Sequence, residues 1–112
     1  ILKKDNYYYL FVSWDYCCRG EKSNYKVVVG RSEKLTGPYL DKTGLSMTQN
    51  GGSLVAEGDN KEWFGAGHNA AYQFEGKYYL IYHGYDAKDK GKPKLIIDEL
   101  QWDSNGWPFI KK

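Results

Sequence analysis

The sequence predicts an all-β fold, and three observations support this prediction. The apolar segments are short runs rich in Tyr, Val, Ile and Phe, with turn residues between them. No window of about 11 residues or more keeps the 3.6-residue period of an amphipathic helix. Thirteen glycines and three prolines punctuate the runs.

Six segments are expected to form strands, because each combines β-branched or aromatic residues with flanking turn signals. In chain order they are Tyr7–Trp14, Tyr25–Gly30, Gly52–Ala56, Ala70–Phe74, Lys77–His83 and Lys94–Leu100. Glu75-Gly76, between the fourth and fifth of these, indicates a hairpin. The charged run at 86–93 predicts a solvated loop.

An internal repeat describes how these strands are organised. Three pairs of segments match in the same order, at offsets of 70, 68 and 70 residues: Tyr8–Ser13 with Tyr78–His83, Val27–Val29 with Leu95–Ile97, and Gly37–Tyr39 with Trp107–Phe109. The repeated unit has an aromatic strand, a polar loop, an aliphatic strand and a turn with Pro before an aromatic residue. A short strand ahead of the unit would complete a four-stranded propeller blade. Two similar hairpins of a β-sandwich are the alternative.

Composition excludes several classes of protein. The 112 residues hold one core of modest size and thus one domain at most. The formal charge of +2 comes from interspersed charges, which predicts no nucleic-acid partner. No apolar run is long enough to span a membrane. Ile1 is neither an initiating Met nor followed by a signal sequence, so we expect the chain to be cut from a longer protein.

Several strings resemble the C-terminal part of an endo-α-1,5-L-arabinanase of glycoside hydrolase family 43. The string YYYLFVSWDYCCRG at 7–20 is the most specific of them, and Gly67-His68-Asn69-Ala70 supports it. The resemblance covers almost the whole chain and implies a five-bladed β-propeller. The chain would then be a partial catalytic domain, with most of blade four, lacking its start, at 1–50, and a loop and all of blade five at 51–112.

The same resemblance implies that no catalytic residue lies in this chain. The family hydrolyses arabinan with inversion, using a general-base Asp, a second Asp that orients it and a general-acid Glu, all of which would lie upstream of Ile1. Inversion requires two carboxyl groups about 6.5 to 9.5 Å apart. The isolated chain is therefore expected to be inactive, and the remaining blades would come from another chain or a swapped copy. The substrate class suggests a secreted or periplasmic protein.

His68 is the candidate metal ligand. A His at the opening of a blade's innermost strand would point to the propeller axis, where imidazole can bind a metal or orient a catalytic group. The resemblance implies a calcium ion in the central channel, held largely through water, since calcium prefers six to eight oxygen ligands. A buried His bonded to backbone is the alternative. His83 is interpreted as structural.

Tyr16, Cys17, Cys18 and Arg19 are candidates for contact with arabinan or an arabino-oligosaccharide. An aromatic face can stack on a furanose, and a guanidinium can donate to two hydroxyls. A purely structural loop is the alternative. Asp15, at the end of a strand, is interpreted as a turn residue rather than a catalytic carboxylate. Glu57, Asp59 and Glu62 are expected to be solvated.

Two further function classes are open at this stage. A non-catalytic carbohydrate-binding module would explain the length and the 17% aromatic content. A structural or interaction propeller would need no site at all. Cleavage of arabinan by the full-length protein, against simple retention of this chain on arabinan, separates the classes.

Overall fold

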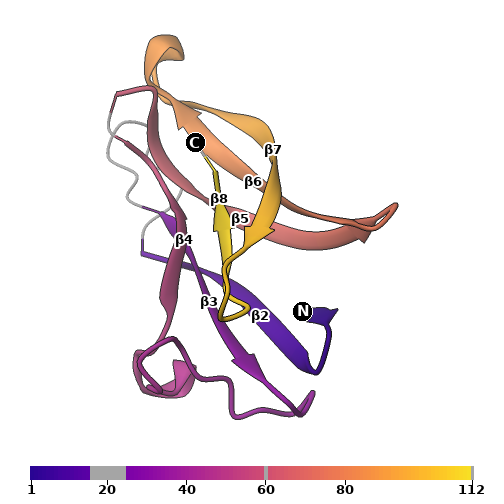
Figure 1. The fold of residues 1–112 in the computed structure, drawn as a ribbon. Coiled ribbons are helices and arrows are strands. Elements are labelled where there is room, and N and C mark those ends of the chain that lie inside the picture. The colour runs from indigo at the N-terminus through magenta and orange to yellow at the C-terminus, as the bar shows by residue number, and fades with distance from the viewer. Residues whose placement is uncertain (16–24, 60, 112) are drawn as a thin grey trace.

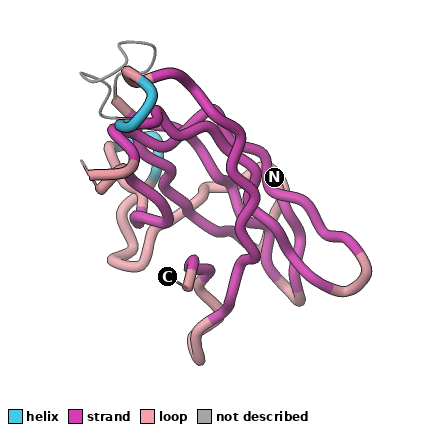
Figure 2. Tube along the Cα trace, turned by 90° about the horizontal axis from the view of Figure 1, so that it is seen from above, coloured by secondary structure: helices cyan, strands magenta, loops and turns pink. Residues whose placement is uncertain are grey.

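The computed structural model describes residues 1–15, 25–59 and 61–111, and nearly all of its regular structure is strand (Figure 2). Eight strands form two antiparallel sheets (Figure 1). The first sheet has the order β1-β2-β3-β4 and the second the order β5-β6-β7-β8. The strands are β1 (Leu2–Lys4), β2 (Tyr7–Trp14), β3 (Lys26–Ser32), β4 (Ser53–Glu57), β5 (Trp63–Phe74), β6 (Lys77–Asp86), β7 (Lys92–Trp102) and β8 (Pro108–Ile110). Two short 3-10 helices, η2 (Met47–Gln49) and η3 (Ala87–Asp89), lie in connections, and no described helix could cross a membrane.

The repeat predicted from the sequence is confirmed as two equivalent sheets. Tyr8–Ser13 lies in β2 and Tyr78–His83 in β6, and each strand is the second of its sheet. The registers agree as well, because Leu10 is opposite Gly30 and Leu80 is opposite Asp98. The short strand expected ahead of the first unit is β1.

The first sheet extends further than the sequence indicated. β4 pairs with β3 and so belongs to this sheet, which ends at Glu57 rather than at residue 50. In the second sheet, the outer strand β8 begins at Pro108, within the last matching segment of the repeat. In the first sheet, Leu40 makes only isolated bridges, to Arg31 and to Ser46, and residues 41–52 intervene before β4. Because of this intervening segment, the outer strand β4 does not align with its counterpart β8 in the sequence repeat.

The core lies between the two sheets, which pack face to face. Alternation along β2 and β3 directs one set of side chains toward the second sheet. Val27 and Val29 are fully buried there, as is Leu80 from β6. The buried cluster also includes Tyr9, Phe11, Tyr82, Leu100 and Trp107. Burial of each large apolar side chain contributes about 1.5 to 3 kcal/mol, so this shared face holds the two sheets together.

The far face of the second sheet is apolar but uncovered. Leu95 and Ile97 are 64% and 59% exposed, although they hold the repeat positions of Val27 and Val29, which are 0% exposed. Tyr72, Phe74 and Phe109 are also exposed. Soluble monomers rarely leave such a continuous patch in water. The composition of this face is therefore that of a sheet face covered by a further sheet.

We predict that the isolated 112-residue chain self-associates or aggregates in dilute buffer, because this face will seek an apolar partner. Sedimentation velocity measures the association. Replacing Leu95 and Ile97 by Lys should reduce it, whereas Gln49→Lys with Glu75→Lys, at exposed positions outside the strands, should not. A well-folded monomer of the unaltered chain would contradict the prediction.

Candidate active-site edge and rim pocket

The candidate metal ligand His68 lies on β5, the strand at one edge of the second sheet. Gly67 pairs with His83 and Ala70 with Ile81, so β5 contains one residue more than β6 between these pairs. This β-bulge is where His68 takes the left-handed conformation, with φ of 53°. The prediction that His68 lies on the first strand of a blade is confirmed, but this strand begins at Trp63, so His68 lies in its middle rather than at its opening. The prediction that it faces a central channel remains a prediction.

A hydrogen-bond cluster from β2 holds the bulge in place. The Ser13 hydroxyl accepts a hydrogen bond from the His68 backbone N–H at 2.8 Å and donates one to Asn69 Oδ1 at 2.7 Å. The Asn69 amide nitrogen donates to the Phe11 carbonyl at 3.3 Å. The residues of the first sheet thereby fix the edge strand of the second.

The His68 imidazole is exposed and lies flat against His83. The ring centroids are 5.3 Å apart and the planes differ by 9°. Among the described residues, the His68 side chain is thus neither buried nor hydrogen-bonded to backbone. Within the described ranges, neither ring nitrogen of His68 has a hydrogen-bond partner, so both are available to a ligand.

Gly67 brings β5 into direct contact with the residue that precedes β3. A Cβ atom at position 67 would come within 2.3 Å of the Tyr25 ring. The Ala66 N–H donates to the Tyr25 carbonyl at 2.8 Å, beside this contact. The absence of a side chain at Gly67 thus permits this close packing.

The predicted sugar-contacting residues Tyr16, Cys17, Cys18 and Arg19 lie outside the described residues. The described residues on either side of this segment are Asp15 and Tyr25. Asp15 forms an ion pair with Lys26 at 3.1 Å, across the ends of β2 and β3. This contact supports its interpretation as a turn residue.

The carboxylates ahead of β5 organise the chain locally. Glu57, Asp59 and Glu62 are exposed, as expected. Asp59 Oδ1 accepts hydrogen bonds from the backbone N–H groups of Lys61, Glu62 and Trp63, which lower the Asp59 pKa to about 2. Over the described part of the chain, no three His, Cys, Asp or Glu side chains are grouped to hold a metal ion.

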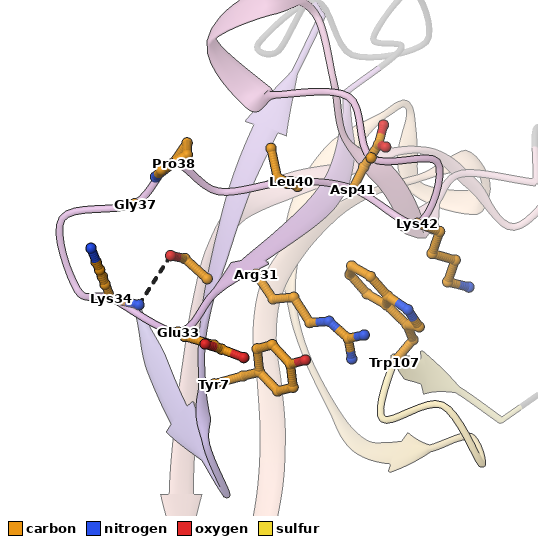
Figure 3. A pocket seen from close by; sticks show the side chains of 12 residues that line it. Tyr7, Arg31, Glu33, Lys34, Gly37, Pro38, Leu40, Asp41, Lys42 and Trp107 are labelled. Carbon is orange, nitrogen blue, oxygen red and sulfur yellow. Dashed lines mark hydrogen bonds between the residues drawn. The ribbon is translucent and has the colours of Figure 1, made fainter.

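A pocket of about 510 Å³ lies at the opposite end of β2 and β3 (Figure 3). The Arg31 guanidinium lies between the rings of Tyr7 and Trp107, 4.2 Å from each centroid. It also donates to the Asn105 carbonyl at 2.8 Å, and Tyr9 donates to the Gly106 carbonyl at 2.5 Å. These contacts join the β7–β8 turn to the first sheet. Sequence reasoning missed them, because they link residues far apart in the chain.

Asp41, also missed from the sequence, organises the loop that forms one wall of this pocket. Its carboxylate accepts backbone hydrogen bonds from Thr43, Leu45 and Gly52 and one from the Thr43 hydroxyl, at 2.7 to 3.0 Å. These bonds, with Gly52 the largest cause, lower the pKa of Asp41 to about 2. The only local signal was an Asp two residues before a Thr, which is typical of an Asx turn.

Two four-stranded antiparallel sheets, equivalent in strand order and packed face to face, define neighbouring blades of a β-propeller. Residues 1–108 match the family model described as glycosyl hydrolases family 43. The chain belongs to this family.

Relatives of known name agree with this assignment. The chain is 57% identical over 110 residues to an extracellular exo-α-(1→5)-L-arabinofuranosidase of Cellvibrio japonicus, and 48% identical over 105 residues to an extracellular endo-α-(1→5)-L-arabinanase of Bacillus subtilis. These matches cover 98% and 94% of the chain. The chain spans about a third of each relative, 31% in both cases.

The structure matches a solved relative over the same extent. A Cellvibrio cellulosa α-L-arabinanase, solved with arabinohexaose, is 55% identical and superposes with a TM-score of 0.95. The match covers 98% of this chain and 35% of that one. The fold is therefore that of part of a family 43 arabinanase propeller, as the sequence predicted.

We predict that Asp41→Asn destabilises the propeller that contains this chain by about 2 kcal/mol at neutral pH, because the hydrogen bonds lose a charged acceptor. Asp41 has a folded-state pKa of about 2, below its ordinary 3.8. Its contribution is thus present above pH 3.8 and lost as the pH falls toward 2. Urea unfolding at several pH values should show the difference between the two proteins shrinking over that window. A difference that is constant with pH would contradict the prediction.

Proposed function

We propose that this chain forms blades four and five of a five-bladed hydrolase that cleaves α-1,5-linked L-arabinan with inversion. The observation that carries the proposal is the 55% identity and TM-score of 0.95 to an arabinanase solved with arabinohexaose. The curated relatives include both an exo-acting and an endo-acting enzyme, and the proposal covers either mode. Because those relatives are extracellular by name, we propose that the whole protein is secreted or periplasmic.

The remaining blades, with the catalytic Asp, Asp and Glu, would come from outside these residues, on another chain or a swapped copy. The uncovered face around Leu95 and Ile97 supports this, since their repeat equivalents Val27 and Val29 are buried between sheets. Asp15, the carboxylate considered for catalysis, is paired with Lys26. This ion pair is a structural contact. It does not supply the two separated carboxyl groups that inversion requires.

A binding module without catalysis explains the aromatic content less well. Tyr9, Tyr82 and Tyr85 are at most 6% exposed, so they serve the core rather than a sugar-binding surface. Trp107 is 7% exposed and packs on Arg31. The contact of Tyr16, Cys17, Cys18 and Arg19 with arabinan is retained as part of the proposal.

A calcium ion in the central channel belongs to the same proposal. The described residues offer it one side-chain nitrogen at most, since the ring of His68 is exposed and no three His, Cys, Asp or Glu side chains among them are grouped to hold a metal ion. Water would supply the other ligands, directly or between ion and imidazole. Bound in this way, the ion would add positive charge beneath the reacting sugar.

We predict that the complete propeller releases arabinose or arabino-oligosaccharides from linear α-1,5-arabinan, whereas the isolated chain releases none. Product analysis by chromatography separates exo from endo action, and NMR of the first-formed anomer tests inversion. His68→Ala in the complete protein should lower the turnover number without lowering the melting temperature. Activity of the isolated chain would contradict the placement of the catalytic groups, and unchanged turnover of the variant would contradict the role of His68.

A further inference from the structure

Two residues outside the predicted site control where the His68 imidazole lies. One is Ser13 on β2, whose hydroxyl accepts from the His68 N–H at 2.8 Å. The other is His83 on β6, whose ring stacks on that of His68 at 5.3 Å and 9°. Sequence reasoning gave Ser13 no role and treated His83 as structural. We infer that Ser13 and His83 are positioning residues for His68, and this inference rests on the proposed role of His68.

The backbone of His68 needs external support. A non-glycine residue at φ of 53° is in a sparsely populated conformation, and the bulge removes His68 from regular pairing with β6. The hydrogen bond to Ser13 replaces the lost pairing. The side chain of Asn69, the next residue, accepts a hydrogen bond from the Ser13 hydroxyl and so fixes its orientation. The first sheet thus sets the direction in which the His68 Cβ leaves the strand.

The ring of His68 needs support of a different kind. An exposed imidazole on a sheet edge would otherwise sample several rotamers. The flat face of His83 favours one of them, with the rings nearly parallel and the His68 nitrogens at the ring edge left open. Outer groups that orient a metal-binding imidazole by a hydrogen bond cost about 10- to 100-fold in metal affinity when they are removed, and a stacked ring restrains the same orientation.

The repeat shows that His83 has a specialised position. It stands where Ser13 stands in the first sheet, 70 residues earlier. Ser13 reaches across to the neighbouring sheet, but His83 contacts a residue of its own sheet. The two equivalent positions thus both contact His68, Ser13 through the His68 backbone N–H and His83 through the His68 ring.

The first experiment tests positioning without any metal. In the complete propeller, crystal structures or ring-proton NMR would compare His83→Ala with His83→Phe. We expect several conformers of His68 in the Ala variant and one conformer in the Phe variant, which keeps a flat ring. Ser13→Ala should likewise disorder residues 67–69, with Ser13→Thr as the variant that keeps the hydroxyl. A single unchanged His68 conformer in both Ala variants would overturn the inference.

The second experiment measures calcium affinity by calorimetry in the same proteins, with CaCl₂ as the probe. His83→Ala should weaken affinity by about tenfold or more, and His83→Phe should restore most of it. Equal affinity in the His83→Ala variant and the unaltered protein would overturn the inference. Absence of calcium binding in the unaltered protein would reject the calcium proposal, and the conformer comparison would still decide whether Ser13 and His83 position His68.

Discussion

The face shared by the two sheets is the constraint on which the other features depend. Val27 and Val29 of β3 reach zero exposure within one buried cluster that also contains Leu80 and Tyr82 of β6. Once the faces meet, their two ends are fixed by polar contacts: Ser13 with His68 and Asn69 at one end, and Arg31 with Trp107 and Asn105 at the other. Hydrophobic packing is non-directional, so these directional contacts set the alignment of the sheets.

The fold was readable from the sequence because it is repeated. Offsets of 70 and 68 residues predicted equivalent strands, and the paired registers follow them residue by residue. The outer strand β4 was assigned to the wrong unit, since the segment at 41–52 interrupts the repeat before it. Asp41 orders that segment through backbone N–H groups, and backbone partners leave little trace in residue type.

The site was readable only in part. Gly67-His68-Asn69 stood out through its glycine and through resemblance, and the structure places it on the edge strand β5 as expected. Ser13 carried no signal, because a serine in an aromatic strand is unremarkable until its partner 55 residues away is known. The family resemblance indicated which chemistry His68 could serve. Its contacts with Ser13 and His83 became known only from the structure.

The exchange of Ser13 for His83 between equivalent positions has a consequence for how the two units can be combined. Repeats share one structural unit, so interchangeable units would make the same contacts at equivalent positions. Here the hydroxyl of Ser13 reaches the next sheet, whereas the imidazole of His83 stacks on a residue of the neighbouring strand in its own sheet. A copy of the second sheet in place of the first would bring His83 to the position of Ser13 and would lose the hydroxyl that supports the His68 bulge, so the two units cannot replace each other at this junction.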